Sequence, residues 1–537
     1  MHATRQTLLT KLTRSPIRVA LLFLAIGFAV YGWSLGNHFL LDDESQVLQN
    51  ELIHSPSNWQ VFFLGSTMHQ EGAALGGIYY KPIMSMCYSL LWWLDPGNSV
   101  PYHIFQLCLM IANALLVWGL LKRHMSELAA LLMAILFLVH PINTEVVAYI
   151  ADLQDVLYTF FGLLALNYLA DTERFTWARR LGFALLLLGS VLSKESGVLY
   201  FVLACVYAGV FKRELWRSVV SIAVLGLVFY FWLRIDVAHL TALTYSQNRI
   251  GRASLDVRLL TAPLVLWSYL WKFIFPRDIT ATQDWVITDA SLMDFWLPLA
   301  GCVIVLALSV WYAVRYWRKM SHSLKFAFFV FWVFMGMGFH SHIAVSLDGT
   351  VADRWFYFSS IGLVAMLGVL LDRLALTKYP RTATAVCLAV IVALGARSTL
   401  RSFDWHDNYT LCLHDLQIFP DSYDMHNNLG VELFRKGNVA DAKKEFERSV
   451  ELAPGWDINW NNLGAAYNAL GDPKEAEKAY LTSMQHGTYY MAYENYASVL
   501  IVQHRIPEAK EFISKKALPL FPASRSLRLM WSAIQDK

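Results

Sequence analysis

Residues 19–44 read VALLFLAIGFAVYGWSLGNHFLLDDE, an apolar run that ends abruptly in three consecutive acids, Asp42, Asp43 and Glu44. The run has the composition of a first membrane span, and the acids follow directly after it. Charge is costly in or near hydrocarbon, so an acid cluster at the end of a span is a candidate functional site. A carboxylate there faces water and a lipid-borne substrate at the same time. The alternative is a solvated loop that only stops the helix.

The composition of the whole chain is that of a polytopic membrane protein. Of its 537 residues 56% are hydrophobic and 16% are charged, and the mean hydropathy of +0.40 is above the usual range for a soluble multi-domain protein. The net charge of +3 is not gathered into a basic patch, so we expect no nucleic-acid partner. Several bases precede the first apolar run and no small-residue cleavage pattern follows it, which predicts an uncleaved signal-anchor.

Apolar runs of roughly 15 to 25 residues predict about eleven transmembrane helices. They lie near residues 19–35, 102–121, 126–140, 156–170, 181–193, 198–211, 218–233, 295–314, 324–340, 356–372 and 382–396. The predicted fold class is therefore all-α. A polytopic membrane domain over residues 1–400 is followed by a linker over 401–420 and a soluble, charged region over 421–537.

Basic residues gather in alternate loops, as the positive-inside rule requires. One set of loops carries Lys122, Arg123, Arg174, Arg179, Arg180, Lys212, Arg213, Arg217, Arg315, Arg318, Lys319, Arg373, Lys378 and Arg381. The opposite loops are rich in acids and poor in bases. This pattern predicts a cytoplasmic N-terminus and, with an odd number of spans, a C-terminal region outside the cytoplasm. The few bases on the outer side, among them Lys81, Lys194 and Arg354, indicate anion binding.

Two outer loops are long enough to have structure of their own. The first, over residues 36–101, contains the acid cluster. The second, over 235–293, contains an aromatic-rich apolar stretch from Leu259 to Phe275, and counting this stretch as a span would break the alternation of Lys and Arg. Helices of this kind commonly lie in the interface plane, so we predict interfacial helices here. A true span with a re-entrant partner is the alternative.

The C-terminal region has a repeat of 34 residues. The motif Asn-Asn-Leu-Gly at 427–430 recurs at 461–464, and the next register position falls at 495–496. A period of 34 with small and aromatic positions is typical of tetratricopeptide repeats, helical hairpins that each bury a face on their neighbour. The sequence predicts about three repeats over 421–522 and a capping helix over 523–537. Such a solenoid usually presents a concave surface to a peptide or protein; the alternative is that it only adds stability.

An ordered set of outer-loop motifs resembles one family. After the acid pair come Tyr80-Lys81-Pro82, Tyr102-His103, HPINTEVVA at 140–148, Asp155, SKESG at 193–197 and VADRWFY at 351–357, followed by the repeats. In this order they are similar to the transmembrane and tetratricopeptide-repeat mannosyltransferases, which are GT-C enzymes that use lipid-phosphosugars. The resemblance covers nearly the whole chain. It implies a GT-C-like membrane domain that transfers a sugar from a polyprenyl phosphate to an acceptor.

Two positions depart from the pattern of that family. Lys81 stands where relatives commonly carry Arg before the Pro, and residues 151–154 read Ala-Asp-Leu-Gln instead of the usual Gly-Arg-Ala type. The second departure bears on donor or acceptor preference relative to the animal members. The short repeat array and the plain N-terminus resemble bacterial members, which implies a bacterial inner membrane with the repeat domain in the periplasm.

Transfer of a sugar to a hydroxyl needs a base to take the acceptor proton and cations at the departing phosphate. By resemblance Asp42 is the catalytic base, and Asp43 orients it or the acceptor. A single base with direct displacement would invert the anomeric centre. The alternative for either acid is to stabilise the loop.

Three bases at outer span ends, Arg354, Lys194 and Lys81, are the candidate ligands of the donor phosphate. A lipid headgroup would lie at this depth, and Arg binds phosphate bidentately. For Arg354 and Lys194 the alternative is a structural ion pair with the neighbouring acid, Asp353 or Glu195.

Other polar residues at the outer boundaries are candidates for lining a cavity between the loops. They are His103, His140, Glu145, Asp155, Glu195 and Asp353. His340 and His342 could form a metal-ligand pair, but the sequence offers no clear third ligand. The sequence therefore predicts no cofactor firmly and leaves a divalent metal open.

Other functions share parts of this pattern. An oligosaccharyltransferase or polymerase that uses a lipid-pyrophosphate-linked glycan would carry the same features. A transporter or flippase for lipid-linked sugars would more naturally show symmetry between its halves, and the sequence shows none. A non-catalytic scaffold that recruits partners through its repeats would tolerate loss of the outer acids. The predicted partners are a polyprenyl-phosphate sugar donor, an acceptor protein or glycan at the repeats, and membrane lipids.

Overall fold

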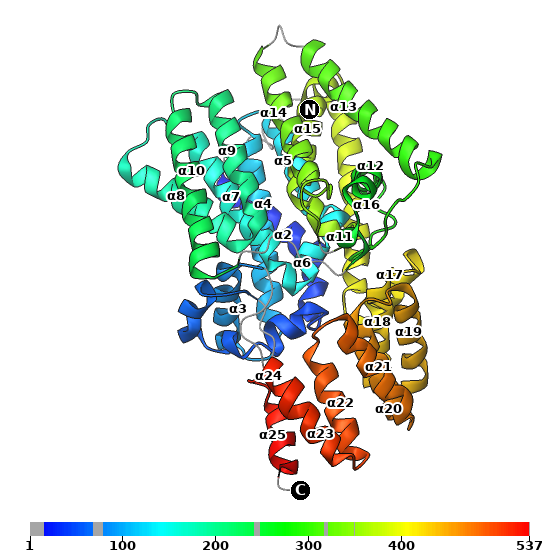
Figure 1. The fold of residues 1–537 in the computed structure, drawn as a ribbon. Coiled ribbons are helices and arrows are strands. Elements are labelled where there is room, and N and C mark those ends of the chain that lie inside the picture. The colour runs from blue at the N-terminus through cyan, green and yellow to red at the C-terminus, as the bar shows by residue number, and fades with distance from the viewer. Residues whose placement is uncertain (1–14, 68–78, 241–247, 316–319, 348, 536–537) are drawn as a thin grey trace.

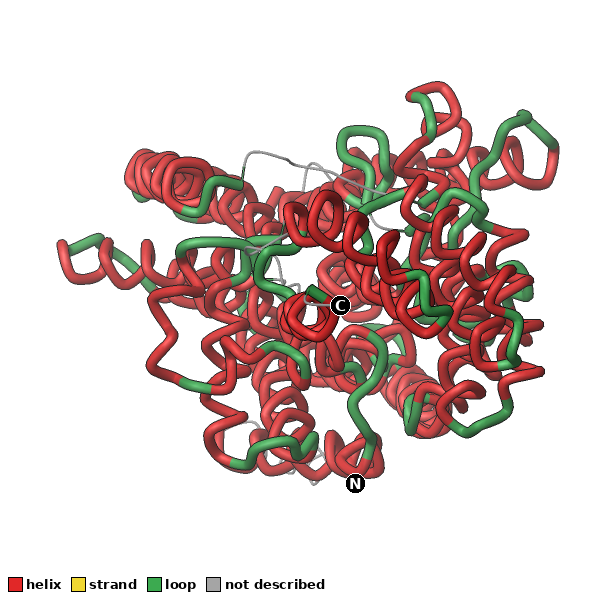
Figure 2. Tube along the Cα trace, turned by 60° about the horizontal axis from the view of Figure 1, so that its bottom comes forward, coloured by secondary structure: helices red, strands yellow, loops and turns green. Residues whose placement is uncertain are grey.

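The computed structural model describes residues 15–67, 79–240, 248–315, 320–347 and 349–535. Some charged residues of the topology argument lie outside these ranges: Arg5, Lys11, Arg14, Arg318, Lys319 and Asp348. Within the ranges the chain is all-α, as predicted, and Figure 2 shows helices joined by loops. The one β-type pairing in the described part is an isolated antiparallel bridge between Gln283 and Val351.

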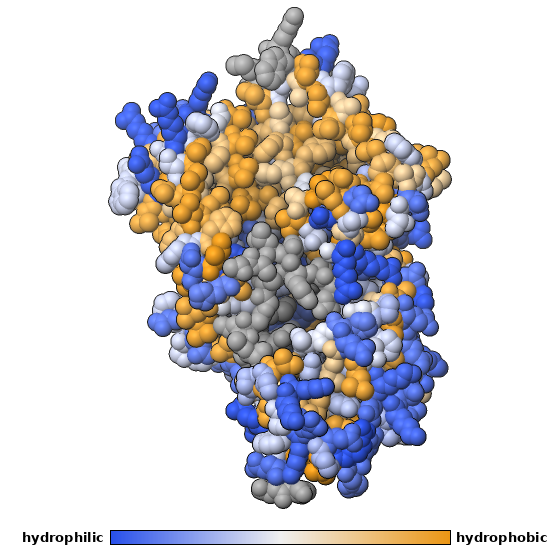
Figure 3. Space-filling view, in the orientation of Figure 1, coloured by the Kyte–Doolittle hydropathy of each residue, from blue (hydrophilic) through white to orange (hydrophobic). Residues whose placement is uncertain are grey.

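The membrane part is a bundle of mostly apolar helices with a few short connecting ones. In chain order they are α2 (Pro16–Tyr31), α3 (Pro82–Leu94), α4 (Val100–Leu121), α5 (Glu127–Val139), α6 (Glu145–Ala148), α7 (Leu153–Asp171), α8 (Trp177–Ser193), α9 (Val198–Phe211), α10 (Trp216–Trp232), α11 (Arg249–Arg252), α12 (Leu255–Ile274), α13 (Leu297–Arg315), α14 (Met320–Phe339), α15 (Tyr357–Leu370) and α16 (Pro380–Asp404). Figure 3 shows a broad apolar surface over this bundle and a mostly hydrophilic surface over the lower part of the molecule. An apolar surface of this extent is stable in lipid and not in water, so the protein is a multi-pass membrane protein.

Each of the eleven predicted spans coincides with a helix. Within the described residues eight helices are long and apolar enough to cross a membrane, or nine if the bent pair Glu127–Val139 and Pro141–Ala148 is one span. Seven of the eight are predicted spans. The remaining four predicted spans form α5, which is part of the bent pair, α8, and the shorter apolar helices Glu195–Phe211 and Ser323–Phe339.

The eighth long apolar helix, α12, is the one that the sequence assigns to the second outer loop. Its length and composition alone would allow it to cross a membrane. The chain segments before and after α12 nevertheless lie side by side: the backbone N–H of Arg249, before the helix, donates to Oδ2 of Asp284, after it, at 3.2 Å. Figure 1 looks nearly along α12, whereas α10 and α16 run up the page. This geometry is the one expected of an interfacial helix, and its place relative to lipid stays a prediction.

The C-terminal part is a solenoid of helical hairpins. Its helices are α17 (Asn408–Ile418), α18 (Tyr423–Arg435), α19 (Val439–Leu452), α20 (Asp457–Ala469), α21 (Pro473–His486), α22 (Tyr490–Val502), α23 (Ile506–Phe512), α24 (Leu518–Leu520) and α25 (Arg525–Ile534). The hairpins α18–α19, α20–α21 and α22–α23 follow one another along the chain, and the lower part of Figure 1 shows them side by side.

The Leu-Gly half of the repeated motif explains how each hairpin packs. Leu429 and Leu463 are buried. A Cβ atom added to Gly430 would lie 2.6 Å from the ring of Phe446, and one added to Gly464 would lie 2.7 Å from the ring of Tyr480. Glycine therefore lets the aromatic ring of the second helix lie against the backbone of the first.

The linker predicted over 401–420 is structured. Helix α17 occupies most of it and contributes to an apolar cluster shared by the two domains: Leu40, Ala148, Tyr149, Ala151, Ala281, Trp405, Leu411, Cys412, Met425 and Leu429. Arg401 of α16 also forms a buried ion pair with Asp415 of α17 at 3.0 Å. The two domains therefore pack against each other next to residues 37–43, and helix α18 of the first repeat contributes to the apolar cluster between them.

Candidate functional site

A cavity of about 820 Å³ lies between the membrane domain and the repeat domain. One side, which we call the membrane-domain wall, includes Asp42, Glu44, Tyr149, Arg354 and the segment 281–284. The other side, the repeat wall, is made by one face of α18 and the residues at the start of α20 and α22: Tyr423, Asp424, Asn427, Asn428, Val431, Glu432, Arg435, Trp456, Asp457, Ile458, Gly487, Thr488 and Tyr489. A molecule in this cavity would touch both domains.

Asp42 is an exposed acid on the membrane-domain wall. Its backbone N–H donates to Tyr149 Oη at 3.1 Å, which fixes the main chain beneath the carboxylate. Within the described part of the chain, no hydrogen bond or ion pair engages the carboxylate oxygens themselves. The group is therefore available to accept a proton from a hydroxyl in the cavity.

Asp43 faces the opposite way and is fully buried. Its Oδ2 accepts from the backbone N–H of Leu40 at 2.9 Å, and its Oδ1 accepts from that of Ala151 at 2.6 Å. Burial raises the pKa of Asp43 well above its usual range, and these two donors oppose the rise. The side chain thus joins the acid loop to the segment after Tyr149, which is the loop-stabilising alternative for this residue.

The residue directly before the two acids, Leu41, has a strained backbone conformation. Leu41 has φ of +45°, in the left-handed region that is unfavourable for a branched side chain. Its N–H donates to Asn408 Oδ1 at 2.9 Å, and the His38 N–H donates to the His406 carbonyl at 3.1 Å. The loop is therefore held by the segment that joins the two domains.

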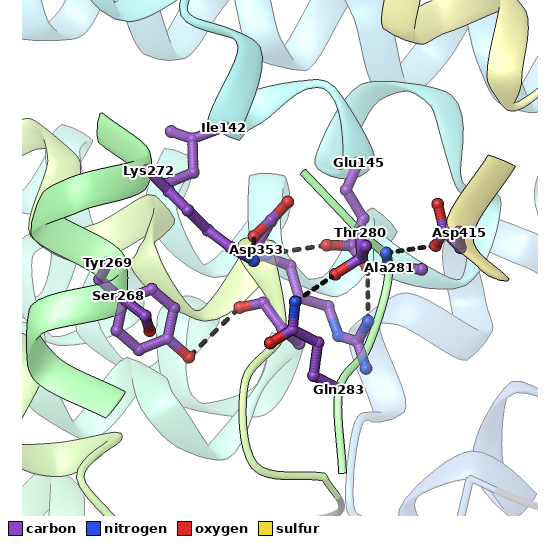
Figure 4. Close-up of polar contacts among 12 residues, drawn as sticks. Ile142, Glu145, Ser268, Tyr269, Lys272, Thr280, Ala281, Gln283, Asp353 and Asp415 are labelled. Atoms are coloured by element: carbon purple, nitrogen blue, oxygen red, sulfur yellow. Dashed lines mark hydrogen bonds and ion pairs between the residues drawn. The ribbon is translucent and has the colours of Figure 1, made fainter. Parts of the chain in front are cut away.

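Arg354 lies on the same wall, between two buried acids. Its Nη1 donates to Glu145 Oε1 at 2.5 Å, its backbone N–H donates to Glu145 Oε2 at 2.9 Å, and its Nε lies 3.5 Å from Asp152 Oδ1. The Arg354 side chain is 17% exposed, and it lines the cavity. The neighbouring acid Asp353 is not its partner; it pairs with Lys272 at 2.8 Å, as Figure 4 shows.

Lys194 and Glu195 diverge in the same manner. Lys194 Nζ donates to both oxygens of Asp155, at 2.8 and 2.7 Å. Glu195 pairs instead with Arg234 at 2.9 Å and accepts from the Tyr80 N–H at 2.8 Å. The sequence offered ion pairs between sequence neighbours as the structural alternative. Those pairs do not form; Lys194 and Arg354 pair with acids of other segments. A turn directs adjacent side chains to different sides, and each finds a charge from another helix.

Lys81 is the third candidate phosphate ligand, and it differs from the other two. It is buried, and no carboxylate within the described ranges lies within ion-pair distance of its Nζ, which sits 4.2 Å from the ring centroid of Tyr79. Burial lowers the pKa of Lys81 to about 8, and the charge of Glu195 opposes the fall. A buried ammonium without a carboxylate partner can bind an anion.

The six residues predicted to line a cavity are not on either wall of the cavity described above. Four of them, Glu145, Asp155, Glu195 and Asp353, are the acid partners just described. His103 Nε2 donates to the Asn37 carbonyl at 3.2 Å, and His140 Nε2 donates to the Phe273 carbonyl at 2.9 Å. Both imidazoles are buried and connect backbone segments. The cavity-lining role of the six stays a prediction.

The two histidines considered as metal ligands also bond to backbone. His340 Nδ1 donates to the Gly336 carbonyl at 2.9 Å, and His342 Nε2 donates to the Thr350 carbonyl at 2.8 Å. In the residues that the structure describes, no group of three or more His, Cys, Asp and Glu could hold a metal ion.

The structure adds residues that the sequence did not single out. Tyr149 supports Asp42, Lys272 and Arg234 neutralise Asp353 and Glu195, and Arg435 of the repeat domain forms two contacts of 2.7 and 2.6 Å with Glu44. A lysine inside an apolar helix, such as Lys272 of α12, is a signal that could have been used. Tyr149 and Arg435 gave no such signal, because their roles depend on distant partners.

The fold and this cavity define the class: a multi-pass membrane protein in which Asp42 and Glu44 border a cavity shared with a tetratricopeptide solenoid. The tetratricopeptide-repeat family matches residues 423–455 and 459–485. Protein O-mannosyl-transferase TMTC3 of Mus musculus is 23% identical over 90% of this chain and 56% of its own length. Protein O-mannosyl-transferase F38B6.6 of Caenorhabditis elegans is 23% identical over 82% of this chain and 64% of its own.

The chain is therefore a homologue of the transmembrane and tetratricopeptide-repeat protein O-mannosyltransferases, as its ordered motifs predict. It spans a little over half the length of the mouse relative. Among solved structures, ArnT from Cupriavidus metallidurans bound to undecaprenyl phosphate aligns over 86% of this chain and 79% of its own, with a TM-score of 0.42 and 14% identity.

Proposed function

We propose that this protein transfers a sugar from a polyprenyl-phosphate donor to a hydroxyl group of an acceptor protein. The reaction would take place on the side of the membrane that carries the repeat domain, which the basic loops predict to be extracytoplasmic and, in a bacterium, periplasmic. Mannose is the sugar that the names of the relatives favour. A donor anchored in lipid and a soluble acceptor would meet at the cavity between the two domains.

The observation that carries this proposal is the place of Asp42. Its carboxylate is exposed in a cavity of about 820 Å³, has no bonding partner among the described residues, and shares that cavity with Arg354 and the first repeat. A base must reach the acceptor hydroxyl, and the acceptor must have room to enter. The adjacent Asp43 meets neither requirement, because it is buried and both of its oxygens are bonded.

In the proposed reaction Asp42 takes the proton of the acceptor hydroxyl as its oxygen attacks the anomeric carbon. The bond between that carbon and the phosphate oxygen breaks, and the polyprenyl phosphate leaves with the electron pair. Displacement in one step inverts the anomeric centre. Arg354 is a candidate to stabilise the departing phosphate, because it borders the cavity and Arg can donate several hydrogen bonds at once. Lys81 and Lys194 would add positive charge that also stabilises the departing phosphate.

The test compares the two neighbouring acids in purified full-length protein. The probes are a mannosyl-phosphoryl-polyprenol and a pool of Ser- and Thr-containing peptides, and the readout is sugar transferred to peptide. We expect Asp42→Asn to lower the rate by about 10²–10⁴-fold with an unchanged melting temperature. Asp43→Asn is the matched control: it should lower the melting temperature, because an amide N–H₂ would face a backbone donor. Full transfer by Asp42→Asn would refute the assignment of the base.

A further inference from the structure

Asparagine occupies the same register in three successive repeats. Asn427 and Asn428 lie in α18, Asn461 and Asn462 lie in α20, and Asn495 lies in α22. We call these five residues the asparagine row. Three of them, Asn428, Asn462 and Asn495, are half-buried and so reach the surface, whereas Asn427 and Asn461 are buried behind them.

Four of the five side chains, those of Asn427, Asn461, Asn462 and Asn495, form a continuous chain of hydrogen bonds across the repeats. Asn495 Nδ2 donates to Asn461 Oδ1 at 2.9 Å, Asn461 Nδ2 donates to Asn462 Oδ1 at 3.1 Å, and Asn462 Nδ2 donates to Asn427 Oδ1 at 2.8 Å. The amides are thereby oriented before any ligand arrives, which lowers the entropy lost on binding.

The row keeps part of its hydrogen-bonding capacity unused. A primary amide has two N–H donors and two acceptor lone pairs, and each bond of the chain uses one of them at either end. Asn428 borders the cavity, and its side chain makes no hydrogen bond within the described part of the protein. The surface amides can therefore each offer a donor and an acceptor to a ligand.

Hairpin packing does not explain these residues. In the first two repeats the Leu of the motif is buried, and the Gly lies against an aromatic ring of the second helix of the hairpin. The third repeat replaces Asn-Leu-Gly by Tyr-Ala-Ser at 496–498, so the packing positions change, and yet Asn495 is present and joins the row. The asparagine is thus separable from the packing part of the motif.

We infer that the asparagine row binds the main chain of an extended polypeptide, whose acceptor residue lies in the cavity at Asp42. This deepens the proposed function and rests on it. The first members of the row, Asn427 and Asn428, line the cavity together with Asp42, and the later members lead away from it along α20 and α22. A primary amide complements the N–H and C=O of a peptide unit whatever the side chain. An extended chain leaves these groups unpaired, whereas a glycan has no main chain of successive peptide units.

The experiment measures binding and transfer separately with two peptides that carry the same acceptor Ser near one end. One has about 6 residues and can span about 20 Å, and the other has about 20 residues and can span about 65 Å. We expect Asn462→Ala and Asn495→Ala each to raise KM for the long peptide by about three- to tenfold, the range of one or two hydrogen bonds. KM for the short peptide and kcat for both should stay unchanged. Asn468→Ala, at an exposed asparagine near the end of α20, is the matched control.

Direct binding keeps this test apart from that of the proposed function. Fluorescence anisotropy of the labelled long peptide is measured on Asp42→Asn protein, so that no chemistry is needed. The row variants in that background should weaken binding by the same factor, and so should methylation of the peptide main-chain nitrogens. Equal effects of Asn462→Ala on the two peptides, or an unchanged affinity for the long peptide in both Asn462→Ala and Asn428→Ala, would overturn the inference and leave the row a purely structural feature.

Discussion

The two walls of the cavity are built in different ways. The membrane-domain wall places its polar groups on irregular backbone: Asp42 follows a strained Leu41, and Arg354 lies in a short turn between two buried acids. The repeat wall carries its polar groups, among them the neutral amides of Asn427 and Asn428, mainly on the regular helix α18. The charges of the repeat domain pair mostly at the surface, as Arg448 does with Asp421 at 2.7 Å.

This difference predicts how much stability the protein loses when one partner of an ion pair is removed. A buried charge that loses its partner is left uncompensated, so each ion pair behind the membrane-domain wall constrains several residues. An exposed pair in the repeat domain loses little, because water replaces the partner. We therefore expect substitutions at the membrane-domain wall to cost much more stability than substitutions in the repeat domain.

The largest effect is expected for Arg354→Ala. It leaves Glu145 and Asp152 buried without their cation, which should lower the free energy of unfolding by about 3–5 kcal/mol. Arg354→Lys keeps the charge but loses the fork geometry, so its loss of stability should be smaller, with weakened use of the donor. Thermal unfolding in detergent and donor titration measure the two effects. Arg448→Ala, which breaks an exposed pair, is the control and should cost less than about 1 kcal/mol. Equal losses for the two arginines would contradict the contrast.

Next in size is a pH effect at Lys81. Its pKa lies below the usual value for lysine, at about 8, so the ammonium is charged at pH 7 and loses its proton as the pH rises to 9. If it binds the donor phosphate, donor affinity should fall by about tenfold for each pH unit above that pKa. Lys81→Arg should flatten the profile, because Arg stays charged. A profile that is the same in wild type and Lys81→Arg would remove Lys81 from the donor site.

A smaller effect is expected where the walls touch. Glu44 follows the acid pair in sequence and meets Arg435 of α18, with side chains 23% and 48% exposed. Arg435→Ala should change stability by less than about 1 kcal/mol, because the pair is open to solvent. KM for the acceptor should nevertheless rise a few-fold, since the pair sets the distance between the walls. The exchange Glu44→Arg with Arg435→Glu should restore KM, and additive losses in the double variant would argue against a coupling.

The smallest effect concerns the turns within the repeats. The first two turns have glycines with positive φ, Gly437 at +80° and Gly471 at +81°, while the third has His504 at +61°. A side chain in this region costs about 1 kcal/mol, so His504→Gly should raise the melting temperature slightly, and Gly471→Ala should lower it. Calorimetry on the full chain tests both. A lower melting temperature in His504→Gly would mean that the imidazole makes contacts worth more than the strain.

The junction of the domains also limits how the repeats can be removed. Met425 and Leu429 of α18 share an apolar cluster with Leu40 and Tyr149, which border the acid loop. A cut at residue 421 would expose this cluster and disturb Asp42, so loss of transfer after such a cut would not isolate acceptor binding. Point changes in α20 and α22 avoid this problem, because these helices contribute no residue to that cluster.

Much of the fold could be predicted because it depends on local patterns. The apolar runs give the helices of the bundle, since only helices satisfy backbone polar groups within lipid. The period of 34 gives the solenoid. The separation of α12 from the spans, which rests on the alternation of bases, stays a prediction. The number of spans is harder to predict from sequence, because short apolar helices such as Pro82–Leu94 and Glu195–Phe211 are shorter than a full membrane crossing.

The sequence is therefore enough to establish the class: a helical membrane domain, a repeat domain, and a set of charged residues at one end of the bundle. Which charged residue pairs with which depends on the tertiary structure. Arg354 turns from its neighbour Asp353 to Glu145, 209 positions away, and of two adjacent acids only Asp42 faces the cavity. The physical reason is that in turns and loops the directions of adjacent side chains are set by distant backbone donors and charges, here those of Ala151 and Lys272.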